Sequence, residues 1–212
     1  MTLPIEINRL NNDLVSAVNE LEEYSQIFEE SKARIDLLNK VAPNFFVKVH
    51  RLFWDCFIMT VSRFTDPGTQ LNNENLSLEV LEKYRTELNE IDQNTLTENL
   101  LNIKTEAIQI RKFRSKYLSH RDLDYALGKN DIGTIDLQKI ANIYRLISDS
   151  LNIFNRHYSG HSILYQHLRT NPGARSLIHY IKEGVIYAEF KARRLSSWLD
   201  EDEILQSEFK DA

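Results

Sequence analysis

The side chains best suited to do chemistry lie in the segment 111–122, which holds five basic residues and a histidine although the chain as a whole is acidic. Arg114 and His120 stand at the centre of this segment. Arginine holds a phosphate through a planar fork of N–H donors, and histidine accepts or donates a proton near neutral pH. The segment therefore carries two of the groups that cleavage of a phosphodiester requires.

The spacing of an arginine and a histidine is weak evidence alone, because other pairs in the chain match it by chance. Arg156 and His161 form such a pair, but Ser159 and Gly160 break the helix between them. An alternative interpretation of residues 111–122 is a solvated helix end, whose cations complement the helix dipole and pair with Asp122 and Asp124. The residues by themselves leave both interpretations open.

Helix geometry separates the two candidate groups. On a straight helix, Arg114 and His120 are about 9 Å apart along the axis and roughly 120° apart around it. Arg111, Arg114 and Arg121 instead share a face, and His120 lies one turn from Lys116. A two-fold axis beside this helix would bring arginine and histidine from two chains into one cleft. We therefore expect a homodimer.

Composition bounds the class of protein. A chain of 212 residues with 42% apolar content can form one substantial core with an appended element, and only 6 Gly and 4 Pro indicate long helices. The net charge of −5 argues against a protein that covers nucleic acid nonspecifically, because such a protein would be basic throughout, but it permits a local basic groove. The first eight residues show no basic start and no apolar run of signal-peptide length, so we do not expect secretion, and residues 52–61 are too few to span a bilayer. We expect no membrane association and a cytoplasmic location.

Apolar residues recur at helical spacing through most of the chain, which predicts an all-α protein. Asn44, Ser77 and Thr134 are candidate N-caps, residues 92–95 should break a helix, and the helix at 44–64 should be the most buried. We expect a helical bundle over residues 1–158 and a C-terminal helical extension over 159–212. The expected helices cover residues 5–40, 44–64, 77–84, 96–120 and 135–158, with two or more beyond residue 160.

Neither a metal nor a cofactor is expected. His157, His161 and His167 are the nearest approach to a metal site, but Gly160 interrupts the turn that would align the first two. No Asp or Glu lies between Ser150 and Glu183 to complete the ligand set. Cys56 is the one cysteine, so sites built from several cysteines are excluded, and we expect a buried, inert thiol.

Four segments taken in order resemble the HEPN superfamily, most closely its abortive-infection branch of the AbiU kind. They are Leu-Phe-Trp-Asp at 52–55, Ser-Arg-Phe-Thr-Asp at 62–66, the Arg-to-His segment at 114–122 and Gly-Thr-Ile-Asp-Leu at 133–137. The resemblance covers roughly residues 5–158. It implies an up-and-down helical bundle that dimerises, with the arginine and the histidine in a cleft at the two-fold interface.

The resemblance also implies a function, a metal-independent endoribonuclease of a toxin–antitoxin or phage-defence system. Arg114 and His120 would be catalytic, with Ser115 and Asp122 supporting them, although family members often carry Asn, Asp or His where this chain has Ser115. The alternative is a noncatalytic helical module that pairs with a nucleotidyltransferase-like antitoxin. In that case Asp122 or Asp124 would pair with the His120 imidazole and keep it from RNA. The expected RNA-binding residues are Arg111, Lys112, Lys116, Tyr117, which is equally suited to the core, and Arg121.

Overall fold

The structure, a computed structural model, describes residues 2–70, 72–119, 135–165 and 173–195. It is an all-α bundle, as the sequence predicts, with one very short antiparallel strand pair. The elements are α1 (Ile5–Phe28), α2 (Lys32–Val41), α3 (Pro43–Thr65), β1 (Thr69–Gln70), β2 (Asn73–Glu74), the 3₁₀ helix η1 (Leu78–Glu87), α4 (Glu90–Phe113), the π-helical segment η2 (Arg114–Ser119), α6 (Leu137–Ser159) and α7 (Gly173–Leu195).

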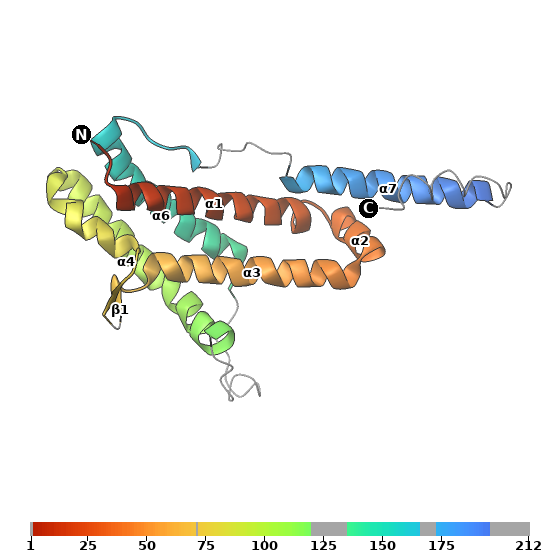
Figure 1. The fold of residues 1–212 in the computed structure, drawn as a ribbon, viewed down its shortest axis with the longest axis horizontal. Coiled ribbons are helices and arrows are strands. Elements are labelled where there is room, and N and C mark those ends of the chain that lie inside the picture. Colours follow the sequence, from red (N-terminus) through yellow and green to blue (C-terminus); the bar gives the residue numbers. More distant parts are fainter. Residues whose placement is uncertain (1, 71, 120–134, 166–172, 196–212) are drawn as a thin grey trace.

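Helices α1 and α3 run side by side along the molecule, and α4 and α6 pack across them (Figure 1). Helix α6 contacts α1, α3 and α4, and ten of its residues are buried. The expectation that residues 44–64 form the most buried helix was therefore wrong. The N-terminal half of α3 extends past α4 and α6, which leaves Phe45, Val47 and Leu52 more than half exposed, at 59%, 66% and 65%.

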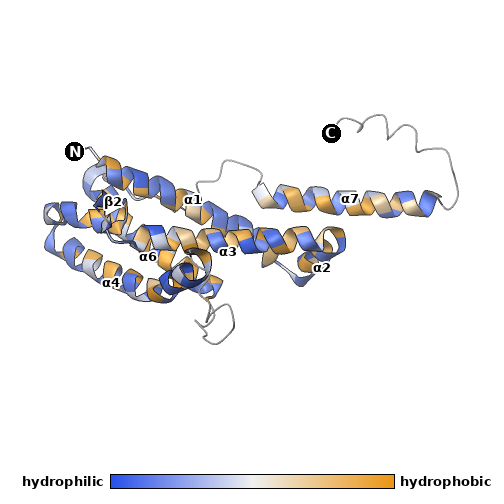
Figure 2. Cartoon of the chain, turned by 60° about the horizontal axis from the view of Figure 1, so that its bottom comes forward, coloured by the Kyte–Doolittle hydropathy of each residue, from blue (hydrophilic) through white to orange (hydrophobic). Residues whose placement is uncertain are grey.

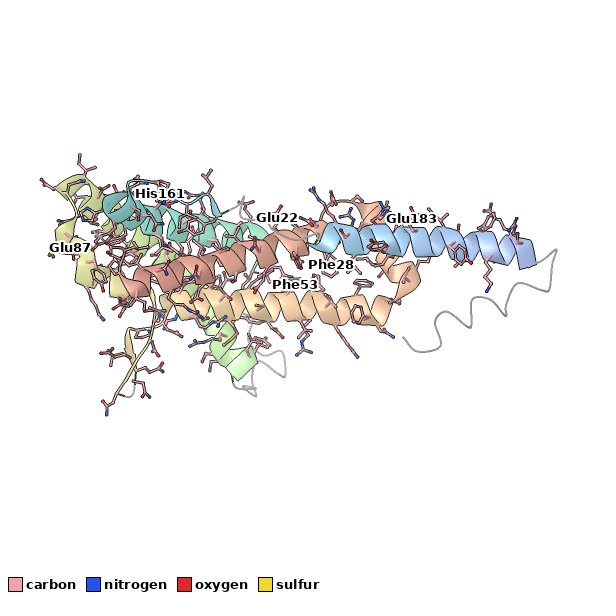
Figure 3. The ribbon with its side chains drawn as sticks, turned by 45° about the horizontal axis from the view of Figure 1, so that its top comes forward. Glu22, Phe28, Phe53, Glu87, His161 and Glu183 are labelled. Carbon is pink, nitrogen blue, oxygen red and sulfur yellow. The ribbon has the colours of Figure 1, made fainter. Side chains whose placement is uncertain are left out.

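The core consists of two clusters of apolar side chains. The larger joins α1, α3, α4 and α6, and its fully buried members include Phe57, Tyr144 and Phe154. Phe28 of α1 and Phe53 of α3, labelled in Figure 3, pack against both clusters. The smaller cluster, through which α7 attaches to the bundle, consists of Ile27, Leu38, Phe46, Ala174 and Ile178.

Three polar side chains within the core, those of Asn11, Asn155 and Tyr165, form hydrogen bonds with one another. The Asn11 amide donates to Asn155 Oδ1 at 2.8 Å, and the Tyr165 hydroxyl donates to Asn11 Oδ1 at 2.6 Å. All three residues are buried, so each hydrogen bond offsets the cost of removing its groups from water. This network, which we call the asparagine network, fixes the start of the chain against α6 and the segment that follows it.

The single helix expected over residues 5–40 is two helices. Ser31 has extended backbone angles, and its hydroxyl accepts a hydrogen bond from the Arg34 amide at 3.2 Å. A serine in this position offers the backbone an N-cap, which competes with continuing the first helix. Arg34 reaches back to the Gln26 carbonyl and to Glu30, so the junction is closed by the residues on its two sides.

Three other expected helix boundaries were wrong. Helix α4 begins at Glu90 rather than near residue 96, because Asn89 Oδ1 accepts from the Asp92 amide at 3.0 Å and acids occupy the first turn. Ala42 rather than Asn44 precedes α3, whose first residue is Pro43. The N-cap of α6 is Asp136, and Thr134 lies outside the described residues. Ser77 does cap η1, as expected.

Helix α7 lies beyond the predicted bundle boundary at residue 158. Its first turns pack on α1 and α2, and the rest of α7 extends away from the bundle (Figure 2). Tyr180, Tyr187 and Phe190 are exposed at 72%, 51% and 53%. Tyr165 also lies beyond residue 158 but belongs to the asparagine network of the core. The division at 158 stays a prediction. Across the described ranges, no helix is both long and apolar enough to cross a membrane.

Candidate functional site

The basic segment begins where the hydrogen bonding of the helix changes. Helix α4 ends at Phe113, and Arg114 opens the π-helical segment η2. Residues 114–119 therefore do not follow the straight α-helix assumed from the sequence, because backbone hydrogen bonds in a π turn run from i to i+5. Single π turns inside α-helices occur frequently at functional sites. The change in winding coincides with the residue expected to bind phosphate.

Asp66 holds the guanidinium of Arg114 in place. Arg114 Nη1 donates to Asp66 Oδ2 at 2.7 Å, and Arg111 Nη2 lies 3.7 Å from Asp66 Oδ1. The three side chains are 23%, 39% and 16% exposed for Arg114, Arg111 and Asp66 respectively. One carboxylate faces two guanidiniums, so the cluster carries a net positive charge and can accept an anion.

The Arg114 guanidinium uses few of its donors on the described residues. Within the described part of the chain its side chain makes one hydrogen bond, whereas a guanidinium has five N–H donors. The half-buried position strengthens its attraction for an anion relative to a fully exposed arginine. Because the aspartate orients the fork before an anion arrives, little side-chain entropy remains to be lost on binding.

Three of the other residues expected to bind RNA, Lys112, Lys116 and Tyr117, lie next to Arg114 along the described chain. Lys112 and Ser115 are exposed, and Lys116 is partly buried. Tyr117 is 42% exposed, and its ring stacks on Phe113 with centroids 4.6 Å apart. The tyrosine thus has one face against Phe113 and an exposed remainder. His120, Arg121, Asp122 and Asp124 lie outside the described residues, and so does the contact that would separate the two functional hypotheses.

Asp66 was not among the residues selected from the sequence. It follows α3 at the turn beginning Asp66-Pro67-Gly68, where an aspartate is most simply interpreted as a turn residue. Its pairing with Arg114 joins positions 48 apart in the chain, so no local pattern predicts it. The one available signal was its place in the segment that resembles the HEPN superfamily.

The carboxylate of Glu79 binds the turn that follows Asp66. Glu79 Oε2 accepts from the Gly68 amide at 2.8 Å, and Lys104 Nζ lies 3.3 Å from Glu79 Oε1. The Gly68 hydrogen bond is the largest cause that lowers the pKa of Glu79, and the charges of Lys104 and Arg111 act in the same direction. The turn that carries Asp66 is thereby tied to η1 and α4.

A groove of about 500 Å³ lies between α1 and α3, and Asp66 is one of the residues that line it. Arg9, Asp13 and Glu20 line it from α1, and Thr60 and Arg63 line it from α3. Glu20 Oε2 accepts from Cys56 Sγ at 3.0 Å, and burial followed by this contact raises the pKa of the Cys56 thiol to about 11. Cys56 is half-buried rather than fully buried as expected, and its thiol stays neutral at physiological pH.

Among the described residues, no three His, Cys, Asp or Glu side chains are grouped as a metal site requires. His161 Nδ1 lies 2.8 Å from the Ser159 carbonyl, in the turn after α6. Gly160 ends α6 with a φ of 74°, a conformation that glycine adopts readily. Arg156 is thus in the last turn of a helix and His161 is outside it. His167 lies outside the described residues.

The all-α bundle and the Arg114 cluster agree with a HEPN-type helical domain, and the family comparison shows that class. Within that class, the family model for AbiU2 matches residues 6–179, so the chain belongs to the AbiU2 family of HEPN domains. The matched region extends beyond residue 158, where the resemblance recognised from the sequence ends, and it includes the first turns of α7. No curated protein and no solved structure matches the chain.

Proposed function

We propose that this chain is a metal-independent endoribonuclease of an abortive-infection or toxin–antitoxin system. Membership of the AbiU2 family supports the link to abortive infection. The observation that carries the chemistry is the half-buried Arg114, oriented by Asp66 at 2.7 Å and accompanied by Arg111. Such a cluster suits a phosphodiester, whose oxygens accept N–H bonds in pairs.

The reaction is transesterification within the RNA. The ribose 2′-oxygen attacks the adjacent phosphorus while its proton passes to a base. The bond from phosphorus to the 5′-oxygen breaks, and that oxygen receives a proton from an acid. A 2′,3′-cyclic phosphate and a 5′-hydroxyl end result. Arg114 stabilises the charge on the nonbridging oxygens, and His120 is the base or the acid. The basic residues Arg111, Lys112, Lys116 and Arg121 bind the neighbouring backbone.

The experiment that tests the proposal is incubation of the full chain with single-stranded RNA in the presence of EDTA. We expect cleavage products with cyclic phosphate ends, at the same rate with and without the chelator. The products are identified by their resistance to phosphatase until acid opens the ring. Intact RNA at micromolar protein concentration would favour the noncatalytic module that pairs with an antitoxin. Cleavage that requires a divalent ion would contradict the mechanism.

The proposed active site combines two copies of the chain. Apolar side chains on the outer faces of the helices favour association, since Leu101 and Ile108 of α4 are 64% and 65% exposed in addition to those on α3. Burial of such side chains is worth about 1.5–3 kcal/mol each. We expect a two-fold dimer in sedimentation at micromolar concentration, and replacing Ile108 with glutamate should shift it toward monomer. A monomeric wild-type chain that still cleaves RNA would overturn the composite site.

A further inference from the structure

The groove between α1 and α3 has the dimensions and the lining of a ligand site. Its volume of about 500 Å³ is within the range of roughly 300–1,000 Å³ that small-molecule pockets occupy. The buried side chains Leu10, Ala17 and Phe64 form apolar parts of the wall. Charged groups stand among them, which gives the groove hydrogen-bonding partners for a planar polar ligand.

Acceptors and planar donors both face this groove. Asp13 and Glu20 supply carboxylates, and Arg9 and Arg63 supply guanidiniums. Arg9 Nε and Asp13 Oδ1 are 3.3 Å apart, with both side chains largely exposed, and Arg63 Nη2 donates to Thr60 Oγ1 at 3.3 Å. The exposed Arg9–Asp13 pair contributes little to stability, so a ligand can replace it at small cost.

Asp66 connects the groove to the proposed phosphate site. It lines the groove, and its Oδ2 accepts the hydrogen bond from Arg114. A nucleotide bound through its phosphate at Arg114 carries its base one ribose away. Asp66 thus belongs to both the phosphate cluster and the groove wall, so the groove can receive that base or the base of the next nucleotide.

The lining distinguishes among the four bases. Guanine is the base whose Watson–Crick edge carries two adjacent N–H donors, N1–H and the N2 amino group, which one carboxylate accepts together. Its O6 and N7 are the acceptors that arginine contacts in pairs. Adenine, cytosine and uracil lack the paired donors in their neutral forms. We propose that the groove is a guanine-binding subsite, an inference that rests on the proposed function of the Arg114 site.

The test measures binding rather than cleavage, so that its result is independent of the ribonuclease activity. Short oligouridines with one central guanine or adenine are made with 2′-O-methyl groups, which remove the attacking hydroxyl. Their affinities for the full chain are measured by fluorescence anisotropy. We expect the guanine oligonucleotide to bind about tenfold more tightly, a difference of about 1.4 kcal/mol. Equal affinities for the two oligonucleotides would overturn the subsite.

The variants separate the groove from general charge effects. Asp13→Asn and Glu20→Gln should each reduce the guanine preference toward unity while the adenine oligonucleotide changes little. The matched control is Asp149→Asn, because Arg145 and Asp149 form the same kind of i,i+4 pair on α6, at 2.9 Å and outside the groove. A preference that survives both groove variants, or that the control abolishes equally, would show that the groove does not read the base.

Guanine can reach the groove within RNA or as a free nucleotide, and competition distinguishes the sources. Guanosine monophosphate is titrated against the bound guanine oligonucleotide, with adenosine monophosphate as the control. If guanosine monophosphate displaces the labelled oligonucleotide at the same concentration as unlabelled oligonucleotide does, the ligand is a free nucleotide. If only the unlabelled guanine oligonucleotide displaces it at that concentration, the ligand is guanine within RNA. Both results support a guanine subsite, whereas equal displacement by the two mononucleotides overturns it.

Discussion

The replacement of Arg114 with alanine is expected to lower the rate of RNA cleavage by about 10²–10³-fold, the usual cost of removing one group that stabilises charge in the transition state. The measurement is the single-turnover rate on a labelled RNA. Arg114→Lys should recover part of the loss at most, because an ammonium is a point charge without the planar fork. Helix content by circular dichroism should stay unchanged, since Arg114 is outside both apolar clusters.

The control for Arg114→Ala is present in the chain. Arg156 also precedes a histidine, but it occupies the last turn of α6, and its Nη1 lies 3.4 Å from Ser162 Oγ. Arg156→Ala removes the same charge from the chain without touching the cluster around Asp66. We expect it to cleave RNA at the wild-type rate. If Arg156→Ala and Arg114→Ala lose activity to the same extent, the loss reports net charge and not the proposed site.

The replacement of His120 with alanine should lower the rate by about 10²–10⁴-fold, the range for removal of a general acid or base. The loss should appear in single-turnover cleavage with RNA binding nearly unchanged, because the imidazole acts on protons more than on affinity. The wild-type rate should depend on pH around neutrality, where histidine titrates, and the residual rate of the variant should lose that dependence.

His161→Ala is the matched control for the histidine. His161 contacts the Ser159 carbonyl at 2.8 Å in the turn after α6, away from the Arg114 cluster. The pH profile of this control should equal that of the wild type. A His120→Ala variant that keeps both the wild-type rate and its pH dependence would remove the histidine from the mechanism, even if Arg114 proves essential.

The sequence predicted the helices better than their ends. Apolar spacing identified the stretches that became α3, α4 and α6, because one face of each helix enters the core. The ends depend on single polar side chains that compete for backbone groups. Ser77 stood in a loop and was recognised as a cap, whereas Ser31 and Asn89 stood within patterns already assigned otherwise. Amphipathic spacing continues across a cap, so periodicity alone cannot locate the break.

The candidate site was predictable only in its local part. Arg114 and its basic neighbours are contiguous in sequence, and a family resemblance added meaning to their spacing. Asp66 and the groove come from residues distant in the chain, brought together when α3 packs against α1 and α4. The π-helical winding of η2 also escaped prediction, since residues 114–119 give no local signal that distinguishes a π turn from an α turn.

The asparagine network sets an order for the assembly of the bundle during synthesis. Asn11 finds its partners at Asn155 and Tyr165, 144 and 154 positions later in the chain. Until the ribosome has released that segment, the buried amide of Asn11 has no native partner, and contacts of such long range close slowly. Helix α1, which forms one wall of the groove, is thus synthesised first, but its Asn11 gains these partners only after residue 165 has been made. A nascent chain would complete its basic segment well before it completes the bundle that positions this segment, so a proposed RNA-cleaving activity would begin only when most of the protein exists.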